Sequence, residues 1–300
     1  ILYAYLFLIA LCTLTFKILG MGWFDAFNHA IPAVATGGFS THDASFGHFD
    51  SVALEIAASI FMLTGALPFI LYVYAVDGRW KNIWADEQLW SLLGMLTLII
   101  TVMSVWLWLN SDYDIYQSVR YVSFNVISVV TTTGFVSTDY NVWGPFASMG
   151  FLFITYLGAC AGSTSGGIKV MRLIITGRML KKHIKNLVYP NGVFIANYQG
   201  RAVSDEEGLN IMGFLGLYVA SNVVITVLLC MTGLDFDTAI SGAAQAIANV
   251  GPGLGPIIGP AGNFSTLHDE ALWLLSLGML LGRLEILTIA VIFSMRFWKG

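Results

Sequence analysis

Two short polar phrases recur in an otherwise apolar chain and carry the residues with the clearest chemical potential. "ATGGFSTHD" covers residues 35–43 and "TTTGFVSTD" covers residues 131–139, and a third glycine-rich stretch, "ANVGPGLG", covers residues 248–255. Glycine adopts positive φ at little steric cost, so such a loop can turn its carbonyl oxygens toward an axis. Carbonyls arranged in this way can replace the water shell of a cation. The phrases therefore predict cation coordination by backbone oxygens, without any side-chain carboxylate.

The composition indicates the setting in which such loops would work. Of the 300 residues, 57% are hydrophobic and only 11% are charged, whereas soluble domains average about 25% charged residues. This is typical of a membrane protein with several helical spans. The chain has no basic stripe, and its three cysteines lie far apart without a CxxC or His/Cys cluster. We therefore expect neither nucleic-acid binding, nor a disulfide framework, nor a zinc site.

Six apolar segments provide candidate spans, each near the ~20 residues that a helix needs to cross a bilayer. They cover residues 2–20, 51–76, 88–109, 145–180, 209–231 and 270–298, and they come in pairs. Between the members of each pair lies a shorter helical piece that leads into a glycine-rich loop, at 23–43, 114–139 and 235–255. An aspartate could cap each piece: Asp25, Asp114, and Asp235 or Asp237. Because these pieces are too short to span, we expect them to be re-entrant, in a unit that occurs three times.

The charges predict an orientation in the membrane. Ten of the 14 Lys and Arg residues lie in the links between pairs and at the C-terminal end, which the positive-inside rule makes cytoplasmic. The three re-entrant loops then open outward, on the side where most aspartates gather. An anionic mouth of this kind would raise the local concentration of cations. Ordinary polar loop residues are the alternative interpretation.

The phrases resemble those of a known family. "ATGGFST", "TTTGFVST" and "ANVGPGLG", with "GSTSGGIKVMR" (162–172) and "MLLGRLEILT" (279–288), are similar to the filters and motifs of TrkH-type subunits in the Trk/Ktr/HKT potassium transporter superfamily. The resemblance implies an all-α integral membrane fold whose helix–pore-loop–helix repeats are arranged like a potassium channel, with pseudo-fourfold symmetry. Residues 1–76, 77–200 and 201–300 would be the second, third and fourth repeats, and a first repeat is expected before residue 1. A natural three-repeat protein is the alternative.

The resemblance also assigns roles to residues and partners. It implies gated, channel-like potassium uptake across the bacterial inner membrane by a homodimer that binds a cytoplasmic, nucleotide-binding TrkA-type subunit. Potassium would be the transported ion, with no covalent cofactor, and the basic stretch 172–185 would suit that subunit or lipid phosphates. Potassium would bind at Gly38, Gly134 and Gly251. The full filter set is Thr36, Gly37, Gly38, Thr132, Thr133, Gly134, Asn249, Val250 and Gly251.

A second glycine-rich stretch, "GACAGSTSGGIK" (158–169), interrupts the apolar segment 145–180. Its glycines and hydroxyl residues disfavour continuous helix. Small-residue packing between helices is one interpretation; by resemblance it is an intramembrane gating loop. An arginine at the centre of a span is costly, so Arg283 is expected to bind the loop's carbonyls, or alternatively to snorkel to the interface. The predicted gate comprises Gly158, Gly162, Ser163, Thr164, Ser165, Gly166, Gly167, Lys169 and Arg283.

Two other classes of protein fit parts of the sequence. An intramembrane serine protease would use Ser163 or Ser165, but it needs a base within hydrogen-bond reach, and no histidine is expected mid-span opposite these serines. A secondary carrier with discontinuous helices would also hold its substrate near the midplane, although three repeats with all their loops on one side argue against the inverted form. We expect a transport protein and not an enzyme.

Overall fold

The computed structural model describes residues 1–284, 291 and 297–298. The described part is mostly helical and includes one short hairpin. Its elements are α1 (Leu2–Ile18), α2 (Trp23–Val34), η1 (Ser45–His48), α3 (Val52–Ala66), α4 (Phe69–Val76), α5 (Trp80–Trp84), α6 (Glu87–Asn110), α7 (Ile115–Val130), η2 (Tyr140–Trp143), α8 (Pro145–Thr155), α9 (Val170–Val188), β1 (Asn197–Tyr198), β2 (Arg201–Ala202), α10 (Asp205–Met231), α11 (Phe236–Ala248), α12 (Gly255–Ile258), η3 (Phe264–Thr266) and α13 (Asp269–Arg283).

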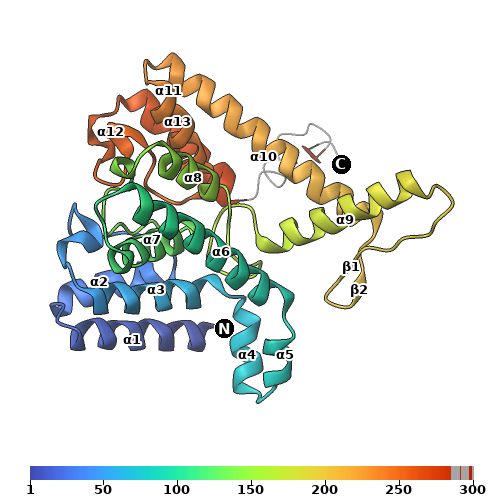
Figure 1. Ribbon diagram of the computed structural model, residues 1–300, viewed down its shortest axis with the longest axis horizontal. Coiled ribbons are helices and arrows are strands. Elements are labelled where there is room, and N and C mark those ends of the chain that lie inside the picture. Colours follow the sequence, from blue (N-terminus) through green and yellow to red (C-terminus); the bar gives the residue numbers. More distant parts are fainter. Residues whose placement is uncertain (285–290, 292–296, 299–300) are drawn as a thin grey trace.

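The helices form three groups in chain order, each with a short helix between two apolar ones (Figure 1). α2 packs between α1 and α3, α7 packs against α6 and α8, and α11 packs against α10 and α13. The first two groups share one apolar core, and the third group has a second core. The short helices α2, α7 and α11 are thus each packed against two apolar ones, as expected for pieces too short to cross a bilayer.

Among the described residues, α6 and α10 are long and apolar enough to cross a membrane. The segment 51–76 does not form the single span that its composition predicts. It consists of α3 and α4, which meet at a bend of 92°. Leu67 and Pro68 separate the two helices, and proline cannot donate the backbone bond that would continue α3. The hydropathy of residues 51–76 indicates a membrane segment, and α3 and α4 together have the length and composition of one. Hydropathy does not indicate that the chain changes direction within the segment.

The predicted interruption of segment 145–180 is confirmed. α8 ends at Thr155 and α9 begins at Val170, with turns and short bridges between them. α9 extends away from the helical groups and, with the β1–β2 hairpin that the sequence analysis did not anticipate, forms the part of the structure at the right of Figure 1. Ile175, Ala196, Tyr198 and Val203 form a small core that holds this extension together.

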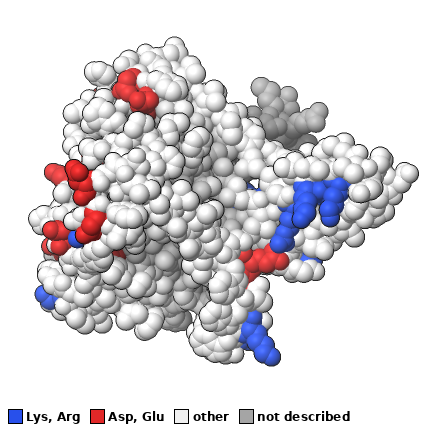
Figure 2. All heavy atoms as spheres, viewed as in Figure 1, with Lys and Arg blue, Asp and Glu red and all other residues white. Residues whose placement is uncertain are grey.

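The charges are distributed unevenly over the surface. In Figure 2, acidic side chains gather mainly over the end where α2 and α7 begin, and the widest basic patch covers α9 at the opposite end. Of the basic residues assigned to the cytoplasmic side, Arg296 and Lys299 lie outside the described residues. The cytoplasmic placement of the others stays a prediction of the positive-inside rule.

Candidate functional site

The loops that follow α2, α7 and α11 share one backbone geometry. In each loop, the N–H of one residue donates to the carbonyl five positions earlier, at the end of the helix: Gly37 to Pro32 (2.8 Å), Thr133 to Ser128 (2.9 Å) and Val250 to Gln245 (3.0 Å). This bond closes each helix with the same wide turn. The three phrases that the sequence analysis aligned therefore adopt equivalent conformations.

The residues on either side of that donor have left-handed backbone. In chain order, the φ values are +51° and +67° at Thr36 and Gly38, +57° and +86° at Thr132 and Gly134, and +58° and +113° at Asn249 and Gly251. A non-glycine residue in this region is uncommon, with asparagine among the enriched types. In an extended strand, successive carbonyls point to opposite sides. The left-handed residues on either side of the donor interrupt this alternation in each loop.

The loops also meet one another through their backbones. A Cβ atom on Gly38 would lie 1.8 Å from the carbonyl oxygen of Thr133, and one on Gly134 would lie 1.9 Å from that of Val250. Only glycine permits an approach this close. The predicted filter residues are therefore brought together, and the negative ends of the α2, α7 and α11 dipoles are directed at the same place.

The aspartates at the starts of the short helices have different roles. Asp114 caps α7 in a capping box with Gln117, and Asp235 caps α11 by accepting from the Thr238 N–H (3.0 Å), a bond that lowers the pKa of Asp235. The predicted cap at Asp25 is wrong, because Gly22 occupies the N-cap of α2. Asp25 lies in the first turn and accepts from the Thr41 hydroxyl (2.7 Å), which lowers its pKa.

A cluster of histidines, which the sequence analysis did not assign to the site, lies beside the first loop. His29 is fully buried in α2, and its ring nitrogens lie 2.8 Å from the Asp25 carbonyl and from the Ser40 hydroxyl. His42 stacks on His48 with ring centroids 3.7 Å apart. Because Ser40 follows Gly38 by two residues, these contacts position the outer end of the loop. His29, His42 and His48 are spaced by 13 and 6 residues, which matches no helix or strand period, so no sign of this cluster was visible in the sequence.

The broken segment between α8 and α9 is a closed loop. The Gly158 N–H donates to the Ile168 carbonyl (2.8 Å), and the Ile168 N–H donates to the Tyr156 carbonyl (3.0 Å), so the two ends are tied together. The side chain of Lys169 turns back and donates to the carbonyl and to the hydroxyl of Ser165, the latter at 3.0 Å. Ser163 and Ser165 share a hydrogen bond of 2.7 Å. No histidine bonds to either serine within the described residues.

This loop contacts the ends of all three short helices. The Thr36 hydroxyl donates to that of Thr164 (3.0 Å), and the Gly166 N–H donates to the hydroxyl of Thr132 (2.6 Å). A Cβ atom on Gly166 would lie 2.1 Å from the carbonyl oxygen of Ala248, at the end of α11. The loop 158–169 is therefore packed directly against the three glycine-rich phrases.

Arg283 holds the same loop from α13. Its guanidinium donates to the Thr164 carbonyl at 3.0 Å. Arg283 is the last residue of α13 and is exposed, so within the described residues it lies at the end of a helix and not in the middle of one, as the apolar segment 270–298 predicted. Arg283 and the loop border a cavity of about 270 Å³ that Lys169, Arg172 and Tyr218 also line.

Helices of spanning length and the short helices packed between apolar ones are typical of a multi-pass membrane protein. The comparisons with known proteins agree. A family model described as "TrkH: Cation transport protein" matches residues 1–299, and the chain belongs to this family.

Named relatives cover almost the whole chain. It is 42% identical over 290 residues to the Trk system potassium uptake protein TrkI of Halomonas elongata and 33% identical over 297 residues to TrkH of Escherichia coli. These alignments include 96% and 98% of the chain but 59% and 61% of the relatives. Such names describe transporters and not enzymes.

A solved structure gives the same result for the fold. The crystal structure of the potassium transporter TrkH from Vibrio parahaemolyticus matches with a TM-score of 0.92 at 33% identity, over 99% of the chain and 64% of that protein. The chain therefore spans about three fifths of the length of the proteins that it resembles.

Proposed function

We propose that this chain forms three walls of a gated potassium pore. The observation that carries the proposal is the shared geometry of the three loops, in which left-handed residues at Gly38, Gly134 and Gly251 flank one helix-closing bond. Backbone carbonyls at the ends of three helix dipoles suit a partly dehydrated monovalent cation. The relatives' names, which specify potassium uptake, support potassium as that cation.

The filter in this proposal comprises Thr36, Gly37, Gly38, Thr132, Thr133, Gly134, Asn249, Val250 and Gly251. The three helix–loop–helix groups are the repeats 1–76, 77–200 and 201–300 of a pseudo-fourfold arrangement, and a fourth wall completes the pore. Because each loop has one left-handed glycine in this role, we expect a short coordinating cage, with a preference for potassium but incomplete rejection of sodium.

The loop 158–169 is the gate of the proposed pore. It lies against all three phrases through Thr164 and Gly166, and its own backbone bonds close it into a compact plug. Arg283 holds the plug through the Thr164 carbonyl. Withdrawal of the loop would break several hydrogen bonds to the phrases, to α3 and to α4, which contribute about 0.5–1.5 kcal/mol each.

The surroundings of the pore belong to the same proposal. We expect a bacterial inner membrane location with α9 on the cytoplasmic side, because its basic side chains cover the end opposite the acidic one (Figure 2). The same basic face suits a TrkA-type regulatory subunit, and we expect the protein to act as a homodimer, as the family resemblance implies.

A flux measurement tests the function. The full-length protein that contains this chain is reconstituted into liposomes, and Rb⁺ uptake is followed under a K⁺ gradient. Rapid passive uptake that K⁺ competes with more strongly than Na⁺ is the expected result. Slow, saturating counter-transport would instead indicate a carrier, and uptake equal to that of empty liposomes would contradict the proposal.

A further inference from the structure

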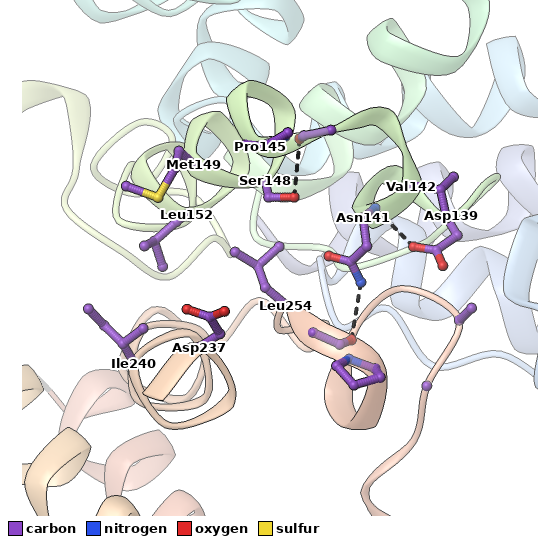
Figure 3. A pocket seen from close by; sticks show the side chains of 15 residues that line it. Asp139, Asn141, Val142, Pro145, Ser148, Met149, Leu152, Asp237, Ile240 and Leu254 are labelled. Carbon is purple, nitrogen blue, oxygen red and sulfur yellow. Dashed lines mark hydrogen bonds between the residues drawn. The ribbon is translucent and has the colours of Figure 1, made fainter. Parts of the chain in front are cut away.

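A cavity of about 680 Å³ lies between the second and third helical groups. The ends of the second and third phrases, at Asp139 and Leu254, belong to its lining, but none of the predicted filter or gate residues does. One wall is α8, including Met149 and Leu152, and the opposite wall is α11, including Asp237 and Ile240 (Figure 3). Leu254, just before α12, closes one side. Its volume is within the range of roughly 300–1,000 Å³ that is usual for small-molecule sites.

The lining of the cavity is mostly apolar and includes two carboxylates. In Figure 3, the carboxylate of Asp237 lies among the apolar side chains of Leu152, Ile240 and Leu254. A second carboxylate, Asp139, stands at the far end of the cavity, where it accepts from the Asn141 N–H (2.9 Å). No basic side chain is among the residues of 1–284 that line the cavity. The site is therefore apolar and negatively charged, with nothing in its described lining to neutralise it.

The cavity also has a defined frame. The side-chain amide of Asn141 donates to the Gly255 carbonyl (3.2 Å) and so connects the segment after the second phrase to the segment after the third. A Cβ on Gly259 would lie 2.3 Å from the same Gly255 carbonyl oxygen and 2.2 Å from the amide nitrogen, so only glycine fits at position 259. The two walls are held together by this contact as well as by the packing of α8 on α11.

We propose that this cavity binds an amphiphilic organic cation, an ammonium group that carries a short alkyl chain. The ammonium lies at Asp237, in the first turn of α11, and the alkyl chain lies against Met149, Leu152, Ile240 and Leu254. Asp237 is exposed on α11, so an ion pair with it is weak by itself, and each methylene that the ligand buries adds about 0.8 kcal/mol. Both parts of the ligand are therefore needed. The proposal concerns a site away from the pore and does not depend on the transport function.

Binding to the purified full-length protein in lipid nanodiscs tests this inference. The probes are hexylammonium, methylammonium and hexanol, and their saturable binding is measured by calorimetry at constant ionic strength. We expect hexylammonium to bind, and both methylammonium and hexanol to bind at least tenfold more weakly. If hexanol binds as tightly as hexylammonium, the site recognises only the alkyl chain. If methylammonium binds as tightly as hexylammonium, the site recognises only the charge. Either result overturns the proposal.

Two near-isosteric variants locate the site. Asp237→Asn is expected to weaken hexylammonium binding at least tenfold. Asp43→Asn removes a carboxylate from the equivalent end of the first phrase, outside the cavity, and is expected to keep binding within twofold. An unchanged affinity in Asp237→Asn, or an equal loss in both variants, would refute the assignment. Ser148→Phe, which fills the cavity without altering charge, is expected to abolish binding; retained binding would show that the ligand lies elsewhere.

Discussion

The hydrogen bond between Arg283 and the gating loop is the most direct point at which to test the proposed gate. The guanidinium reaches the Thr164 carbonyl at 3.0 Å, and the Thr164 hydroxyl in turn accepts from Thr36 and donates to the Gly65 carbonyl (3.0 Å). Thr164 is therefore the residue through which α13, α3 and the first phrase hold the loop. Removing the arginine should loosen the loop without altering the phrases themselves.

The structure sets the size of the effect. A hydrogen bond with a charged donor contributes about 1.5–3 kcal/mol. Because Arg283 is exposed, we take the lower end of this range, about 1.5 kcal/mol. Since 1.4 kcal/mol corresponds to a factor of ten in an equilibrium constant, Arg283→Ala should increase the fraction of open loops, and thus the passive Rb⁺ flux, about tenfold while most channels are closed.

The assay compares variants that separate the bond from the charge. Arg283→Met keeps the length of the side chain and should match Arg283→Ala, whereas Arg283→Lys keeps a charged donor and should stay within about twofold of the native flux. Arg172 lines the same cavity but packs over the Phe214 ring, with its guanidinium carbon 3.8 Å from the ring centre. A flux in Arg283→Ala that is unchanged or lower would refute the reasoning. An equal rise in Arg172→Met would show that positive charge alone closes the pore.

Two further predictions concern the loops and their support. Gly134→Ala places a methyl group 1.9 Å from the Val250 carbonyl oxygen, at a residue with a φ of +86°, so the flux and the preference for K⁺ over Na⁺ should both fall sharply. Gly94→Ala, whose methyl group would meet nothing within 4 Å, should leave both unchanged. A Gly134→Ala protein with native flux and selectivity would contradict the proposed filter. Glu55→Gln removes the buried carboxylate that pairs with Arg120 (2.8 Å). Because Arg120 keeps its second pair, with Asp50 (3.0 Å), the cost should be near the lower end of the range for a broken buried pair, about 3 kcal/mol, seen as a lower thermal midpoint. Asp77→Asn at an exposed pair should cost under about 1 kcal/mol, and equal shifts would show that burial is not decisive.

Local features of the sequence predicted a large part of the fold. The apolar segments correspond to helices in the described residues, and the interruption at 158–169 was visible because its glycines and hydroxyl residues oppose helix over a short range. The cap at Asp114 was predictable, since capping depends on a side chain and on backbone atoms two or three residues away. The predicted cap at Asp25 failed because Gly22 begins α2 earlier, which left Asp25 to bond with Thr41 across the loop.

The direction of chain segments was less predictable than their composition. Segment 51–76 has the hydropathy of one span, yet it turns by 92° at Leu67 and Pro68. A proline in an apolar segment indicates either a kink or an end, and the choice depends on what the freed backbone groups find nearby. Here the Phe69 N–H finds the carbonyl of Gly162, which lies in the gating loop almost a hundred residues away. No local pattern contains that information.

The sequence by itself determined that this is a membrane protein with a recurring glycine-centred loop, because hydropathy and left-handed backbone are properties of single residues and short windows. The tertiary structure decided which residues the phrases contact. Phe135 of the second phrase is fully buried against Phe46, which follows the first phrase in the chain. It also brought Thr164 to Arg283 and Asn141 to Gly255. These contacts join residues far apart in the chain, so packing creates them and no sequence window can show them.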